Sequence, residues 1–318
     1  MKKLNTRNFI VRTVICICLL NFTAATALAE TSGAPVEKKI GVLLVSHGSR
    51  SATWRQALLD LEARVRPTLL TNTAVQGIKT AFMEYTEPSI ATRLKEFDAE
   101  AFTDVIIVPV FLTVSPHTFD DIPTIIGKKV DPHSLELLKL ENIERYNARA
   151  NTVITPNLDF TDVLKKNVLR RVKSLSTNPS EESLVMIAYG DATYEKQWAA
   201  LLDAVGEHVK QNTGVETYGY GWCGHVAHYD PKNTTEAIER VLQRKKKAVV
   251  IPVLVAQDEM FQIKIIGDGI AKVPENQMRV IYRPDSILPD PNIEQWVTDI
   301  TGEYAAKVRA QSPVTANR

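Results

Sequence analysis

Histidine and carboxylate side chains follow three separate apolar runs in the first half of the chain. His47 follows the apolar residues 42–45 after one serine, Glu84 follows a second run, and His117 follows a third. A buried strand ends where its apolar run ends, so these side chains are expected near strand ends. Two imidazoles and a carboxylate suit a divalent first-row metal, and a neutral imidazole can also accept a proton near neutral pH.

Apolar runs and amphipathic stretches alternate along most of the chain. The first series has predicted strands over 39–46, 74–81 and 104–112 and helices near 51–66 and 88–100. The second series has predicted strands near 184–189, 214–220, 248–255 and 279–282 and helices near 193–211, 231–245 and 290–308. This alternation predicts an α/β fold with parallel sheets flanked by helices. The carboxyl ends of parallel strands share one edge, so the three candidate residues should converge there.

The two series resemble each other, which indicates an internal duplication into two similar lobes with a cleft between them. The alignment places Pro109 on Pro252. Tyr189 and Met260 then stand in the places of the two histidines, so a second identical site is not expected. The simpler explanation is chance similarity between apolar strands.

The N-terminus has the pattern of a secretory signal peptide. Basic residues are followed by a short apolar run and by Ala27-Leu28-Ala29, which predicts a signal peptide over residues 1–29. A membrane anchor is the alternative, but the apolar run is short for a span of about 20 residues. Cleavage would change the formal net charge from +1 to −3 and leave an exported, periplasmic protein.

Beyond the signal peptide, residues 30–37 are expected to form a tether, 38–150 an N-terminal lobe and 151–318 a C-terminal lobe. Cys223 is the one cysteine left after cleavage, so the mature chain can form no internal disulfide. The balanced charge gives no indication of nucleic acid as a partner.

Each candidate residue has a simpler explanation when taken alone. His47 could bond a backbone group at a helix start, and His117 could be a surface loop residue. Glu84 could favour a helix N-terminus through its negative charge. Asp120 and Asp121 are interpreted as helix-start residues. The convergence of three strand ends is what favours a functional site. Gly48 fits this interpretation, because a side chain at that position would crowd the approach of a ligand.

Three ordered segments then resemble a known family. "LLVSHGSR" (43–50), "AFMEYTEPSI" (81–90) and "VIIVPVFLTVSPHTFDDIP" (105–123) are similar to the signature segments of the sirohydrochlorin cobaltochelatases, which are class II tetrapyrrole chelatases. The resemblance covers residues 38 to about 130. Ser46 replaces a usual glycine, and "TVSPH" replaces a typical glycine-histidine approach.

The resemblance implies insertion of Co²⁺, or Fe²⁺, into sirohydrochlorin or a related cyclic tetrapyrrole, as in cobalamin biosynthesis. It implies that His47 and His117 bind the metal and accept protons, with Glu84 as the third contributor. His225 would add a metal ligand from the second lobe, or its loop would instead grip the surface between the lobes. Metal and tetrapyrrole are substrates, so no separate cofactor, nucleic acid or stable membrane anchor is expected, and an oligomer is not excluded.

Two other functions compete with the enzyme. An exported metal- or haem-binding protein that keeps the chelatase scaffold would explain the signal peptide, and so would a solute-binding protein of two α/β lobes. The presence of His47, Glu84 and His117 together favours the enzyme, because a carrier needs binding groups but no proton acceptor.

The first prediction concerns the N-terminus. Residues 1–29 should be absent from the mature protein because of the basic, apolar and small-residue pattern that ends at Ala29. N-terminal sequencing or intact mass of the exported protein measures this. Retention of Met1 in a membrane fraction would instead support the anchor.

Overall fold

The computed structural model describes residues 37–111, 117–158 and 160–311. The predicted signal peptide over 1–29, and the tether over 30–37 except for its last residue, lie outside the described residues and remain predictions. Within the described parts of the chain, none of the helices combines the length and apolar character needed to cross a membrane.

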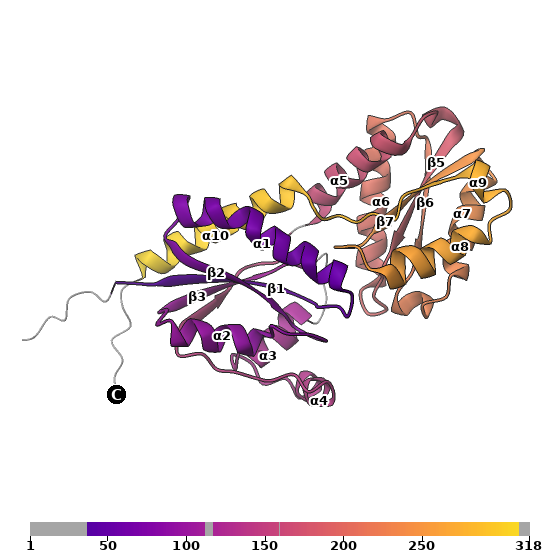
Figure 1. The fold of residues 1–318 in the computed structure, drawn as a ribbon. Helices are drawn as coiled ribbons and strands as arrows, with labels where there is room; N and C mark the ends of the chain where they lie inside the picture. The colour runs from indigo at the N-terminus through magenta and orange to yellow at the C-terminus, as the bar shows by residue number, and fades with distance from the viewer. Residues whose placement is uncertain (1–36, 112–116, 159, 312–318) are drawn as a thin grey trace, which may run out of the picture. The chain divides into compact units, whose positions relative to one another are not determined.

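The first lobe is a four-stranded parallel sheet with the strand order β2-β1-β3-β4. Its strands are β1 (Ile40–Ser46), β2 (Val75–Phe82), β3 (Asp104–Pro109) and β4 (Asn151–Ile154). One face is covered by α1 (Ala52–Asn72) and α10 (Pro291–Ala310). The other face packs against α2 (Ile90–Ala99), α3 (Ile122–Ile125) and α4 (Pro132–Leu140) (Figure 1). Aliphatic side chains fill both faces of β1, as expected for a central parallel strand.

The second lobe repeats this plan with the order β6-β5-β7-β8, also all parallel. Its strands are β5 (Glu182–Ala188), β6 (Thr217–Trp222), β7 (Lys247–Val253) and β8 (Val280–Tyr282). Its helices are α5 (Phe160–Leu175), α6 (Glu195–Asn212), α7 (Lys232–Leu242), α8 (Gly267–Ala271) and α9 (Asn276–Arg279). Short helical turns complete the lobes: η1 (His117–Asp121), η2 (Pro179–Glu181), η3 (His225–Ala227) and η4 (Glu259–Ile266).

The registers of the two sheets correspond residue by residue. Val45 lies beside Pro109 in the first sheet, and Ile187 lies beside Pro252 in the second, as the sequence alignment of the two halves requires. The prediction of an α/β fold with two similar lobes is therefore confirmed.

The boundary between the lobes differs from the expected one at 150/151. β4 starts at Asn151 and pairs with β3, so the first sheet continues to Ile154. α5 then packs on α6 and β7, so the second lobe begins with this helix. A four-residue strand at a sheet edge carries too little apolar pattern to be recognised alone.

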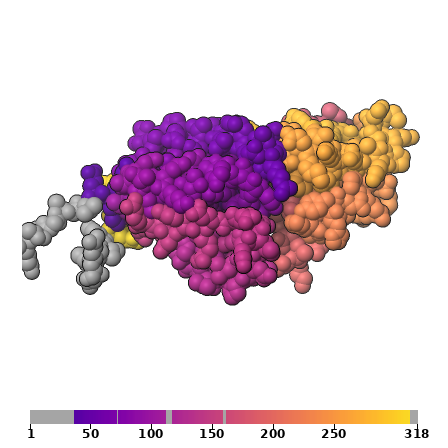
Figure 2. Space-filling view, turned by 60° about the horizontal axis from the view of Figure 1, so that its bottom comes forward, coloured from indigo at the N-terminus to yellow at the C-terminus, as the bar shows by residue number. Residues whose placement is uncertain are grey.

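The end of the chain returns to the first lobe. α10 packs against α1 and β3, and Figure 2 shows C-terminal residues in yellow beside the indigo residues of the first lobe. The first lobe is therefore built from two distant parts of the sequence.

The buried carboxylate of Asp290 connects the two segments at which the chain passes between the lobes, α5 and the start of α10. It caps α10 by accepting from the backbone N–H of Asn292 at 2.7 Å, and it accepts from Asn167 Nδ2 at 2.7 Å and from Arg170 at 2.8 Å, both on α5. Burial opposes its ionisation, but these hydrogen bonds outweigh burial and hold the pKa of Asp290 below its usual range. The start of α10 is thereby fixed to α5.

Replacing this carboxylate tests that arrangement. Asp290→Ala should lower the free energy of unfolding by about 2–4 kcal/mol, because it removes a helix cap and leaves buried donors unpaired. Urea denaturation measures the loss. Asp299→Ala, on the exposed side of the same helix, should change it by no more than about 0.5 kcal/mol. Equal effects of the two substitutions would contradict the role given to Asp290.

Candidate metal centre

The pairing of β1 with β2 continues past the ends of both strands and sets Glu84 beside His47. Met83 N–H donates to the Ser46 carbonyl at 2.9 Å, and Glu84 N–H donates to the His47 carbonyl at 2.8 Å. Gly48 has a φ of +105°, and a Cβ there would lie 2.1 Å from the Glu84 carbonyl oxygen. The glycine is thus required by the close approach of two backbone segments, and the expectation that a side chain here would crowd a ligand stays a prediction.

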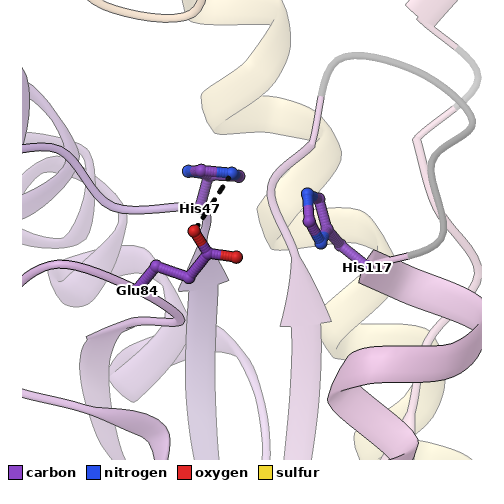
Figure 3. A group of neighbouring side chains, drawn as sticks. All are labelled: His47, Glu84 and His117. Atoms are coloured by element: carbon purple, nitrogen blue, oxygen red, sulfur yellow. Dashed lines mark ion pairs between the residues drawn. The ribbon is translucent and has the colours of Figure 1, made fainter. Parts of the chain in front are cut away.

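The three predicted side chains converge above the ends of β1 and β3 (Figure 3). Their potential ligand atoms all lie within 4.8 Å of one another. His47 Nε2 is 3.7 Å from Glu84 Oε2, and the rings of His47 and His117 are 4.9 Å apart between centroids. All three residues are half-buried, so a metal ion could reach them from solvent.

Hydrogen bonds to Nδ1 leave Nε2 of each histidine free to bind a metal. His47 Nδ1 lies 3.2 Å from the Gly48 carbonyl oxygen, and His117 Nδ1 lies 2.7 Å from Asp121 Oδ2. Both partners are acceptors, which assigns the proton to Nδ1 and the lone pair to Nε2. A carboxylate behind a ligating imidazole also fixes its orientation and increases its basicity.

Asp121 has a role that the sequence did not reveal. It was expected to be a helix-start residue, but its side chain makes no capping hydrogen bond to α3 and is bonded to His117 instead. Burial opposes its ionisation, yet the bond with His117 outweighs burial and holds the pKa of Asp121 below its usual range. In the sequence, this contact is indicated by the spacing of four residues between His117 and Asp121.

Burial shifts the protonation of the other two residues in opposite directions. It lowers the pKa of His47 to about 4, with the charge of nearby His117 as the second cause. It raises the pKa of Glu84 to about 7. At neutral pH His47 is therefore a neutral ligand, whereas Glu84 is ionised in only part of the molecules.

The donor set fits a divalent first-row metal held loosely. Metal–ligand distances of about 2.0–2.2 Å limit two ligands of one ion to a separation of roughly 4 Å. The distance of 3.7 Å between His47 Nε2 and Glu84 Oε2 is within that limit, and all three potential ligand atoms lie within 4.8 Å of one another. Three protein ligands also leave coordination positions open for a second molecule.

A cavity of about 270 Å³ adjoins this centre and is lined by residues of both lobes. Its aromatic lining comprises Trp54, Tyr85, Phe111, Tyr189, Trp198 and Phe261. None of these aromatic residues was predicted from the sequence to belong to the site. For Tyr189, the alignment with His47 in the two halves of the sequence indicated a place at the site. A flat, largely apolar ligand would fit such walls.

The second lobe contributes aromatic surface in place of metal ligands. Tyr189 follows β5 as His47 follows β1, and Gly224 donates its N–H to the Tyr189 carbonyl at 2.9 Å as Glu84 does to His47. Within the described part of the chain, the one group suited to a metal is His47, Glu84 and His117. The second lobe therefore repeats the backbone of the site but not its chemistry.

His225 lies outside this metal-binding group. It lines the cavity, its Nδ1 is 2.9 Å from Tyr229 Oη, and its ring packs edge-on against Tyr189 with 5.4 Å between centroids. Cys223 is fully buried, and burial raises the pKa of its thiol to about 12. Among the described residues, Cys223 and His225 therefore do not belong to a group that could hold a metal ion.

Hydroxyl groups at the start of α1 connect the two lobes next to the cavity. Ser49 Oγ donates to Asp258 Oδ2 at 2.6 Å. Ser51 and Thr53 both donate to the carboxylate of Glu259 at 2.7 Å. These bonds hold the loop after His47 against the second lobe.

The fold and the site define a two-lobed α/β protein with a histidine–carboxylate group that could hold a metal ion. Residues 41–175 match the CbiX family, and the sirohydrochlorin cobaltochelatase of Methanococcoides burtonii is 36% identical over 101 residues, which are 32% of this chain and 72% of that protein. The chain belongs to the CbiX family of sirohydrochlorin chelatases. The corresponding protein of Methanothermobacter thermautotrophicus is 36% identical over 89 residues, 28% of this chain and 59% of that protein.

Solved structures share the whole two-lobed fold. SirB from Bacillus subtilis with Fe³⁺ aligns with a TM-score of 0.59 at 18% identity, covering 86% of this chain and 98% of SirB. The complex of the chelatase SirB from Bacillus subtilis subspecies spizizenii with cobalt gives a TM-score of 0.56 at 17% identity and the same coverage. The curated relatives align with about a third of the chain, whereas these structures extend the likeness to both lobes.

The raised pKa of Glu84 predicts how metal binding depends on pH. Below about pH 7 a metal ion must displace a proton from Glu84, so the affinity for Co²⁺ should rise about tenfold between pH 6 and pH 8. Calorimetric titration measures this. Glu84→Gln should bind more weakly and lose this dependence, while Glu87→Gln, which alters an exposed carboxylate bonded to Ser89 N–H, should retain it. An unchanged pH dependence in Glu84→Gln would show that another group controls binding.

Proposed function

We propose that this protein inserts a divalent metal, Co²⁺ or Fe²⁺, into sirohydrochlorin or a closely related tetrapyrrole. The convergence of His47, Glu84 and His117 at the edge of an aromatic cavity carries this proposal. The names of the curated relatives and the Fe³⁺ and cobalt complexes of SirB support the choice of substrates.

The metal ion, a substrate of the reaction, would first bind to the two free Nε2 atoms and the Glu84 carboxylate. Imidazole together with carboxylate suits Fe²⁺ and Co²⁺, whereas Mg²⁺ and Ca²⁺ prefer oxygen ligands throughout. Because the ligands are few and spread apart, the ion can be handed to the four nitrogens of the macrocycle without first leaving a closed complex.

Insertion also releases two pyrrole N–H protons, which must go to a base. His47 is a weak proton acceptor, because its pKa of about 4 lies far below neutral pH. Glu84 has a pKa of about 7, which is well placed for a group that accepts and then releases a proton. We therefore assign His47 and His117 chiefly to the metal, and Glu84 to both metal binding and proton transfer.

The aromatic walls would hold the ring of the macrocycle against the metal centre. Tyr189 and Phe261 stand in the wall formed by the second lobe, and their rings lie 5.4 Å apart between centroids. His225 is part of this wall, bonded to Tyr229, and we place it against the macrocycle and not on the metal.

Substitution of the histidines tests the proposed function. His47→Ala and His117→Ala should each lower the rate of metal insertion by a factor of about 100 or more, because each removes a ligand. Absorbance of sirohydrochlorin mixed with Co²⁺ or Fe²⁺ measures the rate. Folding should remain nearly intact because both residues lie at the edge of the sheet, and binding of metal-free tetrapyrrole should be affected less than turnover.

Two further variants sharpen this test. Asp121→Asn should reduce insertion by a factor of about 10, because it weakens the orientation of His117 without removing a ligand. His208→Ala, on α6 and bonded to Asn212, should leave the rate unchanged. A His47→Ala, His117→Ala double variant that inserts metal at the wild-type rate would refute the proposal, and one that fails to fold would assign both residues to the core.

A further inference from the structure

The cavity beside the metal centre offers no fixed positive charge to a substrate. No lysine or arginine is present among the described residues that line it. Two carboxylates do line it, Asp191 and Asp258, and both are engaged: Asp191 accepts from the N–H groups of Thr193 and Tyr194, and Asp258 from Ser49 Oγ. An anionic group placed deep in this cavity would meet aromatic rings and like charges.

Sirohydrochlorin, the substrate proposed above, carries carboxylate side chains around its periphery. Burying these carboxylates without a cationic partner is strongly unfavourable. The cavity volume of about 270 Å³ also lies just below the range for small-molecule sites, about 300–1,000 Å³. A macrocycle that fills this cavity would leave part of its edge, with its carboxylates, outside the aromatic walls.

Arg50 lies next to one residue of the cavity lining, Tyr85. Its guanidinium carbon lies 5.2 Å from the centroid of the Tyr85 ring, and Tyr85 lines the cavity with 54% of its surface exposed. The Tyr85 ring is in turn 5.8 Å from the ring of His47. The exposed side chain of Arg50 is therefore held by a cation–π contact with Tyr85, and Tyr85 in turn contacts His47.

The guanidinium of Arg50 is free to bind a ligand. Within the described ranges, no Asp or Glu carboxylate lies within 4.0 Å of it, in contrast to Arg64, which is paired with Glu294 at 2.6 Å. Its backbone is fixed, because Arg55 donates to the carbonyl oxygens of Ser49 and Arg50 at 2.8 Å. The loop thus presents an unpaired guanidinium from a fixed position.

We propose that Arg50 binds a peripheral carboxylate of the tetrapyrrole and selects for polycarboxylate macrocycles. This inference rests on the proposed function and deepens it. A guanidinium binds a carboxylate through two parallel hydrogen bonds, which fix orientation as well as position. Arg50 would hold a peripheral carboxylate at the first lobe, whereas Asp191 and Asp258 would repel carboxylates at the second lobe.

Equilibrium binding of metal-free sirohydrochlorin tests this role separately from catalysis. Trp54 and Trp198 line the cavity, so quenching of their fluorescence reports occupancy. Arg50→Ala should raise the Kd about tenfold or more, because a charge-assisted bidentate contact is lost. Arg50→Lys should fall between this variant and the wild type, because it keeps the charge but not the two-pronged geometry.

Two controls distinguish a specific contact from a general effect of charge. Arg244→Ala removes the same charge from an exposed position before β7, at the end of the sheet opposite the cavity, and should change the Kd by less than about twofold. A tetrapyrrole that lacks peripheral carboxylates should bind to Arg50→Ala and to the wild type with the same Kd. In metal insertion, Arg50→Ala should raise KM while kcat stays within about twofold.

The outcomes separate this inference from the proposed function. Wild-type protein that binds sirohydrochlorin but inserts no metal would refute the proposed function, while weaker binding by Arg50→Ala would still support the role of Arg50. Metal insertion with a Kd that is the same in Arg50→Ala, Arg244→Ala and wild type would refute the role of Arg50 alone. A wild-type protein that binds no polycarboxylate tetrapyrrole would refute both.

Discussion

The backbone hydrogen bonds from Met83 and Glu84 to Ser46 and His47 extend the pairing of β1 and β2 beyond the strands. This extension depends on Gly48, because no other residue leaves room for the Glu84 carbonyl. β1 is also paired with β3, so the register of one central strand sets how all three site residues approach each other. A shift of one residue would turn every side chain of β1 to the opposite face. The metal centre is in this sense a consequence of parallel pairing.

The second lobe shows that the same backbone arrangement does not by itself make a metal site. Its strands repeat the order and register of the first sheet, and the bond from Gly224 to Tyr189 reproduces the bond from Glu84 to His47. Tyr189 takes the place of His47, and Gly224 takes the place of Glu84. The second lobe therefore lacks these potential ligands, and Tyr189 supplies aromatic surface instead. Two copies of one fold thereby provide different parts of a single site, with the ligands in one lobe and much of the apolar wall in the other.

Partial burial meets two demands that the proposed function makes of this site. A ligand must be deprotonated to bind a metal, and burial secures this for His47 by lowering its pKa to about 4. A proton acceptor must exchange its proton near neutral pH, and the same burial brings the pKa of Glu84 to about 7. Asp121 remains ionised behind His117 because its hydrogen bond outweighs burial. One partly dehydrated edge of the sheet thus gives three ionisable groups different protonation states.

The sequence by itself determined the α/β class, the strands β1, β2 and β3 and the residues His47, Glu84 and His117. These features follow from apolar runs and from what comes directly after them, which are local properties of the chain. Only the tertiary structure decided that Asp121 orients His117, that β4 joins the first sheet, and that α10 returns to pack on α1. It also decided that the second lobe presents Tyr189 to the cavity and that Arg50 rests on Tyr85. Such features depend on contacts between side chains and segments whose approach is set by packing, and no local pattern encodes them.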